Sequence, residues 1–550
     1  MTFLSILLIA MFITMALIPI LRMAAERWRC GLDVPDARKV HCVPVPKVGG
    51  MAMAVGALLP VLFVADGGRF VNSVLIGAWI IVAFGVADDF RNLNWKVKFL
   101  GQVIAALVVI VYGGIEICFL GACLPEGVRL PPPLSLPLTL LVVVGVTNAI
   151  NLSDGLDGLA GGTSLLIFLC ILFLCYTVGE FPERFFIILL CTAMVGAIFG
   201  FLRFNTYPAA VFMGDAGSQL LGFLAITLSL GVTQRDLPLS PVLPLLLLGF
   251  PVLDTLTVMV ERIAAGRMPF DPDKNHFHHK LMRLGLWHTE SVVAIYAITA
   301  MLVAAAYFLR FHSEWLLLGC FAAFCGVVVL AFTAAERRGF RFQRTGFFDL
   351  EVKGRLKALK DLKLPIRTSF AVLRFGLPLL VAAAALVPAE VPAYVSAVCA
   401  GSAAVIGLIW VVSQEWLGTV LRVIFYLSVP FLLRIGQETP AEWIDPAMLK
   451  VYGIGFGVLA LGMVLTLKFT RRQKGFKATP MDFLILVIAL VVPNLPDPAI
   501  KAFHMGELAV QIIVLFFGFE VLAGELRGNL GRLGLGLMGA YLLVALRVVV

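Results

Sequence analysis

Long apolar segments alternate with short polar segments along the whole chain, from the first residues to Val550. Most of the apolar segments approach the length of about 20 residues with which an α-helix crosses a hydrocarbon layer of roughly 30 Å. Counted in this way, the pattern predicts about eighteen membrane-spanning helices. We therefore expect an all-α polytopic membrane protein.

The predicted spans fall into two groups. Eleven precede residue 335, over residues 2–20, 50–65, 73–88, 99–115, 136–151, 160–178, 185–202, 211–231, 240–261, 291–309 and 314–334. Seven follow residue 368, over residues 369–388, 391–412, 416–434, 450–469, 481–495, 506–524 and 532–549. This grouping predicts a membrane-embedded domain at 1–334, a basic linker at 335–368 and a second multi-span module at 369–550.

The composition agrees with this pattern and the charge gives an orientation. With 60% hydrophobic and 14% charged residues, a water-soluble globular fold is excluded. The net charge of +9 comes from Lys and Arg concentrated in alternate loops, over residues 22–47, 91–98, 262–283, 337–367 and 471–477. Because cationic loops stay on the cytoplasmic side, the chain is expected to start outside, and no nucleic-acid partner is needed to explain its charge.

In the linker, leucines and lysines follow a helical spacing on separate faces around residues 352–362. This spacing is typical of an interfacial helix that rests on anionic lipid headgroups. A solvated charged connector is the alternative.

The sequence NAINLSDGLDGLAGG at 148–162 interrupts the apolar pattern between two predicted spans. An aspartate near the centre of a span costs roughly 2.5 to 3.5 kcal/mol on insertion scales, so such residues usually line a site. The polar residues recur at every third position, as Asn148, Asn151, Asp154 and Asp157. The glycines between them let a ligand approach the backbone, so we expect a polar helix end built for a ligand.

Two further clusters precede this motif. The loop at 33–50 combines glycines with the cations Arg38, Lys39, His41 and Lys47. Asp88 and Asp89 end the third predicted span, and Lys98 opens the fourth. Adjacent carboxylates can bind Mg²⁺ or accept a proton, while the lysine can hold phosphate. A cytoplasmic basic loop and an ordinary helix-end pair are the alternatives.

Two clusters follow it. Asp215 lies in the turn GDAGS, whose backbone N–H groups suit an anion and whose carboxylate suits a cation, with a simple helix cap as the alternative. Residues 262–283 hold a basic and histidine-rich set: Arg262, Arg267, Asp273, Lys274, His276, His278 and His279. The alternating spacing of the histidines in a loop can bring two or three imidazoles together on one ligand. Their cationic neighbours favour phosphate or sugar over zinc, and a passive loop is the third option.

All five clusters fall on the predicted cytoplasmic side. Together they supply hard oxygen donors for Mg²⁺ and a surrounding set of cations. These are the groups that an enzyme needs for phosphoryl transfer. Because this site would lie where helices meet the membrane interface, one phosphate carrier is expected to be a lipid and the other to arrive from the cytoplasm.

Five motifs now point to a family. DVPDARKVH with PKVGG, DDFRNLNWKVKFLGQ, NAINLSDGLDGLAGG, FMGDAGS and HFHHKL occur in this order. With them, residues 1–334 resemble the polyprenyl-phosphate N-acetylhexosamine-1-phosphate transferases of glycosyltransferase family 4 type. The resemblance implies transfer of HexNAc-1-phosphate, most simply GlcNAc-1-phosphate, from UDP-HexNAc to undecaprenyl phosphate. The implied products are undecaprenyl-diphospho-HexNAc and UMP, the first membrane step of cell-envelope polysaccharide synthesis.

The resemblance also implies roles. The enzyme would use Mg²⁺, with Mn²⁺ as an alternative, at the cytoplasmic face of the inner membrane. Asp88, Asp89 and Asp215 would be catalytic, and Asn151 would bind the metal together with Asp215. The other implied contacts are Lys98 with phosphate, Asp154 and Asp157 with the nucleotide sugar, and Arg262, Arg267, His276, His278 and His279 with the diphosphate and sugar. Asn148 is assigned to substrate binding, although a helix-end hydrogen bond would explain it equally well.

Two alternatives remain at this point. The phospho-MurNAc-pentapeptide transferase branch shares the aspartate clusters but tends to carry a different first loop and an HHH tract. A transporter or flippase would place ionisable residues near the bilayer midplane in both halves, whereas here they gather at one face of one half. Residues 369–550 match no family motif and could bind a partner enzyme, a flippase or lipid, or stabilise a homodimer.

Overall fold

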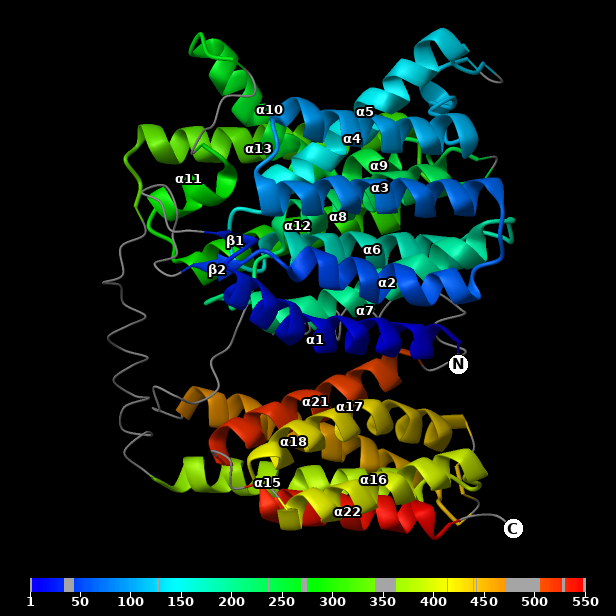
Figure 1. Ribbon diagram of the computed structural model, residues 1–550, viewed down its shortest axis with the longest axis vertical. Helices are drawn as coiled ribbons and strands as arrows, with labels where there is room; N and C mark the ends of the chain where they lie inside the picture. The colour runs from blue at the N-terminus through cyan, green and yellow to red at the C-terminus, as the bar shows by residue number, and fades with distance from the viewer. Residues whose placement is uncertain are drawn as a thin grey trace. The chain divides into compact units, whose positions relative to one another are not determined.

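Helices dominate the protein (Figure 1). The computed structural model describes residues 2–33, 44–125, 128–235, 237–268, 275–341, 363–412, 414–438, 440–441, 443–469, 505–526 and 530–547. Within these ranges, twelve helices are long and apolar enough to cross a membrane, and four shorter apolar helices accompany them. The predicted all-α polytopic membrane fold is confirmed, while the total of eighteen spans stays a prediction.

The described residues form two compact units, the first within 2–341 and the second within 363–547. The first half of unit 1 contains α1 (Thr2–Trp28), β1 (Leu32–Asp33), β2 (Val45–Pro46), α2 (Gly49–Val64), α3 (Arg69–Arg91), α4 (Trp95–Leu107), η1 (Val108–Tyr112), η2 (Gly121–Cys123) and α5 (Pro132–Ser153). The second half contains α6 (Leu159–Thr177), α7 (Arg184–Asn205), α8 (Gly214–Thr233), α9 (Leu243–Leu247), α10 (Gly249–Ala264), α11 (Phe277–Arg283), α12 (His288–Leu309) and α13 (Glu314–Arg337). β1 and β2 pair as a short antiparallel ribbon.

Helix α8 lies at the centre of unit 1. Its apolar window is entirely buried, and it packs against α2, α3, α5 and α6. A helix that is apolar on every face is stable only when neighbours surround it, which explains the central position. Since α8 begins at Gly214, its first turn carries Asp215 into the space between the surrounding helices.

Two glycines bring neighbouring backbones onto the start of α8. A Cβ atom on Gly50 of α2 would lie 2.2 Å from the backbone nitrogen of Gly217, and one on Gly85 of α3 would lie 2.4 Å from Cα of Ala216. Both distances are impossible for real side chains. Only glycine therefore lets α2 and α3 approach the first turn of α8 this closely.

One predicted span is wrong. The apolar pattern predicts a continuous helix over 240–261, but the structure has α9 and α10 with Leu248 at their junction. Pro251 lacks the N–H group that would bond to the carbonyl of Leu247, so a continuous helix would lose a hydrogen bond here. Figure 1 shows α10, in green, projecting from the bundle of unit 1.

Unit 2 has its own hydrophobic core. It contains α15 (Lys363–Leu386), α16 (Ala393–Val412), α17 (Gln414–Glu438), α18 (Pro446–Phe469), α21 (Met505–Leu526) and α22 (Gly531–Ala545). Leu377, Phe425, Phe519 and Tyr541 are among the fully buried residues that pack these helices together. The predicted span at 481–495 and the predicted interfacial helix lie outside the described residues. The limits of the linker, 335–368, stay a prediction.

Candidate active site

A single lysine joins two carboxylates at one end of unit 1. Lys98 Nζ lies 2.5 Å from Asp88 Oδ2 and 2.7 Å from Asp215 Oδ2. The three residues come from the end of α3, the start of α4 and the start of α8. With both carboxylates ionised (−2) and the ammonium charged (+1), this cluster carries a net charge of −1. The site therefore retains an attraction for a further cation.

The turn between α3 and α4 explains why Asp88 meets Lys98. Asn92 ends α3 in the left-handed conformation at φ 46°, and its N–H donates to the carbonyl of Asp88 over 2.8 Å. The side chain of Asn94 then caps α4 by accepting from Lys96 N over 3.1 Å. The N–H of Leu93, between these asparagines, donates to Asp88 Oδ1 over 2.6 Å. The tight turn thus fixes one Asp88 oxygen and leaves the other to Lys98.

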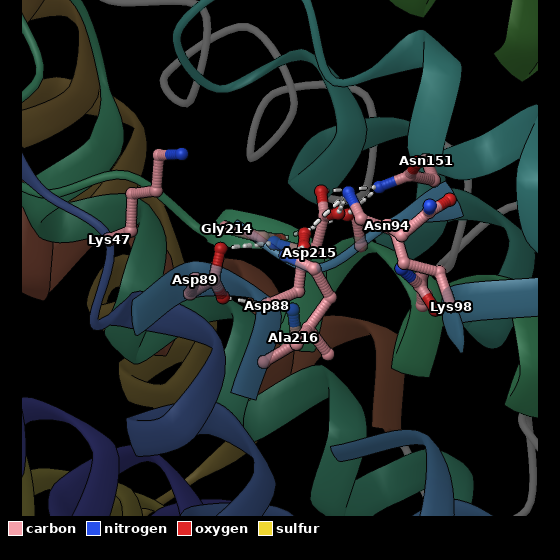
Figure 2. Close-up of polar contacts among 12 residues, drawn as sticks. Lys47, Asp88, Asp89, Asn94, Lys98, Asn151, Gly214, Asp215 and Ala216 are labelled. Carbon is pink, nitrogen blue, oxygen red and sulfur yellow. Dashed lines mark hydrogen bonds and ion pairs between the residues drawn. The ribbon is translucent and has the colours of Figure 1, made fainter. Parts of the chain in front are cut away.

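Asn151, on α5, adds a fourth helix to the cluster. Its Nδ2 donates to Asp215 Oδ1 over 3.1 Å and to Ser218 Oγ over 2.7 Å. Ser218 in turn donates to the carbonyl of Gly214 over 2.9 Å. Figure 2 shows Asp215 with Asp89 on one side and with Lys98 and Asn151 on the other. The end of α5 and the start of α8 are thereby joined through side chains predicted to share a metal.

Asp89 has a different environment from Asp88, although the two are adjacent. Its Oδ1 accepts from Asp215 N over 2.9 Å, and its Oδ2 accepts from Ala216 N over 3.1 Å. Both oxygens therefore accept from N–H groups in the first turn of α8. A negative charge at this position is also stabilised by the partial positive charge at the helix N-terminus. Gly214 makes this approach possible, because a Cβ there would lie 2.4 Å from Asp89 Oδ2.

The described end of the first loop supports the same turn. Gly49 N donates to the carbonyl of Phe212 over 2.9 Å, and Gly50 N donates to that of Met213 over 2.8 Å. Lys47 pairs with Asp33 across the β-ribbon, with Nζ 3.2 Å from Oδ1. Arg38, Lys39 and His41 lie outside the described residues.

The two aspartates after α5 lie in different surroundings. Asp157 Oδ2 accepts from Ala209 N over 2.9 Å, and its own N–H donates to His288 Nε2 over 3.1 Å. Asp154 follows the last residue of α5. Burial raises the pKa of Asp154 to about 7, with the negative charges of Asp215, Asp157 and Asp89 adding to the rise. A cation in the site would favour its ionised form.

The histidine segment contains a residue that sequence reasoning missed. Asp254, buried on α10, places Oδ2 2.9 Å from His276 Nδ1 and accepts from Phe277 N at Oδ1 over 2.7 Å. It thereby orients His276 at the start of α11. A lone carboxylate in the apolar sequence FPVLDTLTV was the available signal, because such residues are rare in apolar helices unless they bind something.

The prediction that all three histidines lie in a loop is wrong, while their convergence on one ligand stays a prediction. His278 and His279 lie on helix α11, and the rings of His276 and His278 stack with centroids 5.7 Å apart. A Cβ on Gly155 would lie 2.3 Å from His278 Nε2, so α11 packs directly on the loop after α5. Burial, with the nearby His279, His276 and His288, lowers the pKa of His278 and keeps its imidazole neutral.

The remaining predicted residues are more dispersed. Arg262 is buried in the last turn of α10, while Arg267 follows that helix and is exposed. Asp273 and Lys274 lie outside the described residues. Asn148 lies one turn deeper in α5 than Asn151 and pairs with Gln102 rather than with the aspartates. Their roles toward substrate stay predictions.

The donor set fits a magnesium ion that shares its ligands with a phosphate. No group of three or more His, Cys, Asp and Glu residues with metal-binding geometry occurs in the part of the chain that the structure describes. Mg²⁺ commonly uses only one or two protein carboxylates and completes its shell with phosphate oxygens and water. Asp215, the amide oxygen of Asn151 and Asp88 could supply such a partial set.

Comparison with known proteins identifies the family to which this chain belongs. Residues 71–233, which include Asp88, Lys98, Asn151 and Asp215, match the model of glycosyl transferase family 4. A probable undecaprenyl-phosphate N-acetylglucosaminyl 1-phosphate transferase of Bacillus subtilis (strain 168) is 38% identical over 290 residues, which cover 52% of this chain and 79% of that protein. This chain belongs to glycosyl transferase family 4. The family resemblance predicted from the motifs is confirmed.

Other family 4 relatives extend the similarity. Undecaprenyl-phosphate alpha-N-acetylglucosaminyl 1-phosphate transferase of Escherichia coli (strain K12) is 32% identical over 298 residues, covering 53% of this chain and 80% of that protein. Decaprenyl-phosphate N-acetylglucosaminephosphotransferase of Mycobacterium leprae is 36% identical over 295 residues, covering 48% of this chain and 72% of that protein. Each alignment covers about half of this family 4 chain.

Proposed function

We propose that this family 4 member transfers GlcNAc-1-phosphate from UDP-GlcNAc to undecaprenyl phosphate, giving undecaprenyl-diphospho-GlcNAc and UMP. The printed names of its relatives support a polyprenyl-phosphate acceptor and a GlcNAc-1-phosphate group. The observation that carries the proposal is the contact of Lys98 with both Asp88 and Asp215. The ammonium group of the lysine can bind phosphate and the carboxylate oxygens can bind a metal ion, and both lie at one end of a membrane bundle.

The cofactor proposed for this cluster is Mg²⁺, with Mn²⁺ as the alternative. Bound there, the metal would neutralise charge on the diphosphate and on the departing UMP. Asp215 and Asn151 would hold it, and Asp88 contacts the same Lys98 ammonium as Asp215. The ammonium group of Lys98 already bridges the two carboxylates, so it can contact a phosphate oxygen without leaving the site.

The proposed reaction is a direct displacement. An oxygen of the lipid phosphate forms a bond to the sugar-linked β-phosphorus, the bond from that phosphorus to the bridging oxygen breaks, and UMP leaves with the electron pair. A phosphate monoester has a second pKa near 6, so the attacking group is largely dianionic at neutral pH and needs no strong base. This agrees with Asp89, whose two oxygens are both occupied by backbone N–H groups.

A covalent route through an aspartyl phosphate is the rival mechanism. It requires a carboxylate free to attack the β-phosphorus. Acid-quenched enzyme that retains label from UDP-GlcNAc labelled in its β-phosphate would support this rival. Direct displacement predicts that no label stays with the protein.

The surroundings of Lys98 support a lipid acceptor. The large side chains of Trp95, Phe99 and Leu100 on α4 are exposed beside it. In a membrane-spanning helix such side chains face hydrocarbon, so a polyprenyl chain can lie along α4 while its phosphate reaches Lys98. The positive-inside rule supports a cytoplasmic site in the inner membrane.

The nucleotide sugar is proposed to lie between the loop after α5 and helix α11. Asp154, Asp157, His276, His278, His279, Arg262 and Arg267 are the residues proposed to contact it. The close approach of His278 to Gly155 supports this arrangement, because it unites two motifs that lie far apart in the sequence. A homodimer remains a separate proposal.

The decisive experiment measures UMP release by membranes that contain the protein and added undecaprenyl phosphate. UDP-GlcNAc, UDP-GalNAc and UDP-MurNAc-pentapeptide are compared, each with Mg²⁺, with Mn²⁺ and with chelator. We expect release from UDP-GlcNAc that requires the divalent ion. Release only from UDP-MurNAc-pentapeptide would favour the other branch, and no release from any donor would contradict the proposed function.

A further inference from the structure

Three amide side chains, two of them buried and one partly buried, lie one helical turn deeper in the bundle than the candidate site. Residues separated by three or four positions share one face of a helix. Each amide has this relationship to one site residue: Gln102 to Lys98 on α4, Asn148 to Asn151 on α5, and Gln219 to Asp215 on α8. The same three helices thus carry a polar layer beneath the three side chains that meet at the site.

These amides bind one another across the helices. Gln102 Nε2 donates to Asn148 Oδ1 over 3.2 Å, and Asn148 Nδ2 donates back to Gln102 Oε1 over 2.6 Å. Gln102 Nε2 also donates to Gln219 Oε1 over 3.1 Å. Gln102 and Gln219 are both almost completely buried. We call Gln102, Asn148 and Gln219 the amide layer.

The amide layer constrains helix register in a way that apolar packing does not. Apolar side chains tolerate small shifts, whereas a buried amide that loses its partner finds no water inside a membrane bundle. Sliding one helix by one residue moves its side chains about 1.5 Å along the axis and rotates them by about 100°, which would break the reciprocal pair. The amide layer therefore holds α4, α5 and α8 in one relative register.

We propose that the amide layer positions Lys98, Asn151 and Asp215 for phosphoryl transfer. This inference rests on the proposed function. None of the three amides reaches the substrate in this role; each acts through the site residue one turn above it. A misplacement of about 1 Å at a catalytic group can lower a rate by roughly 100-fold, so a register device beneath the site has a large effect on turnover.

The test compares single and combined substitutions. Gln102→Leu removes the central amide and leaves Asn148 and Gln219 without these partners. The triple variant Gln102→Leu/Asn148→Leu/Gln219→Leu makes the whole layer apolar, so no member is left unpaired. Gln219→Met keeps the length of its side chain and removes the amide, including the oxygen that accepts from Gln102. Each is assayed for UMP release against Mg²⁺ concentration and for thermal unfolding in detergent.

Two matched controls lie in the same helices. Thr147 on α5 and Thr227 on α8 are buried, and their hydroxyl groups donate to carbonyls within their own helices, Val143 and Phe223 respectively. Thr147→Val and Thr227→Val therefore each remove a buried hydrogen bond that lies within a single helix. We expect both to keep wild-type turnover.

We expect Gln102→Leu to lower both turnover, by roughly 10- to 100-fold, and the unfolding temperature. The triple variant should regain most of the unfolding temperature but keep low turnover and a raised Mg²⁺ requirement. A purely structural role predicts that turnover recovers together with stability, and that result would overturn the proposal. If the triple variant does not fold, wild-type turnover in Gln219→Met would overturn it instead. Wild-type protein that releases no UMP would contradict the proposed function rather than the amide layer.

Discussion

Each unit contains a cluster of ionisable side chains near a membrane segment, and the two clusters are built differently. In unit 2, Arg422 Nε donates to Glu520 Oε1 over 2.8 Å, and the hydroxyl of Tyr426 donates to the same oxygen over 2.5 Å. One cation thus pairs with one carboxylate, and the phenol of Tyr426 donates a further hydrogen bond to that carboxylate. In unit 1, one cation, Lys98, pairs with two carboxylates, those of Asp88 and Asp215.

The two clusters have similar solvent exposure, but they differ in net charge. The side chains of Arg422 and Glu520 are 34% and 20% exposed, and those of Lys98 and Asp215 are 32% and 26% exposed. The unit 2 pair is neutral and joins α17 to α21. This is typical of a structural ion pair between two helices. With both carboxylates ionised, the unit 1 cluster keeps a net negative charge, which is costly to maintain unless a cation or a ligand balances it.

The largest expected effect comes from Asp215→Asn. The substitution keeps the shape of the side chain and removes the charge that a metal requires. We expect UMP release to fall by roughly 1,000-fold or more, the scale on which preorganised charge stabilisation contributes to catalysis. The unfolding temperature should stay near that of the wild type. An active Asp215→Asn protein would show that the metal site lies elsewhere.

The next largest effects are expected from the adjacent carboxylates, where Asp88→Asn should lower turnover and Asp89→Asn should mainly lower stability. Asp88→Asn removes charge from the cluster and is expected to lower turnover with little change in stability. Asp89→Asn weakens the cap of α8 and is expected to cost about 1 kcal/mol of unfolding free energy, with the smaller loss of turnover. Paired turnover and unfolding measurements check both. A greater loss of turnover in Asp89→Asn, without any loss of stability, would mean that Asp89 acts on the substrate.

The unit 2 cluster should affect stability and leave catalysis unchanged. Arg422→Leu or Glu520→Leu leaves one half-buried charge without this partner, and each is expected to cost about 1 to 3 kcal/mol of unfolding free energy. The double variant should recover part of that loss, because neither charge remains. UMP release, normalised to folded protein, should equal that of the wild type in all three. Reduced release by the stable double variant would give unit 2 a catalytic role.

The smallest effect is expected from removing unit 2 altogether. A chain that ends at residue 345 keeps every described side chain of the candidate site. We expect this shortened protein to release UMP at nearly the wild-type rate in membranes. Its expression level serves as the control for folding. A folded but inactive shortened protein would make unit 2 part of the transferase rather than an accessory module.

The amino-acid sequence by itself determined the membrane class, most spans and the family. Span length and loop charge follow from the cost of placing polar groups in hydrocarbon, which acts on each segment separately. Motif order likewise needs no knowledge of packing. The site residues Asp88, Lys98, Asn151 and Asp215 were therefore accessible from the sequence, as was the polar character of 148–162.

Tertiary structure alone decided which of these groups meet. Asp88 and Asp89 look equivalent in the sequence, yet the turn before α4 sends one to Lys98 and the packing of α3 on α8 sends the other to backbone N–H groups. The contact of Asp254 with His276 depends on the break between α9 and α10 and on the position of α11. Sequence spacing fixes neighbours within one helix, but contacts between helices depend on the packing of the whole bundle.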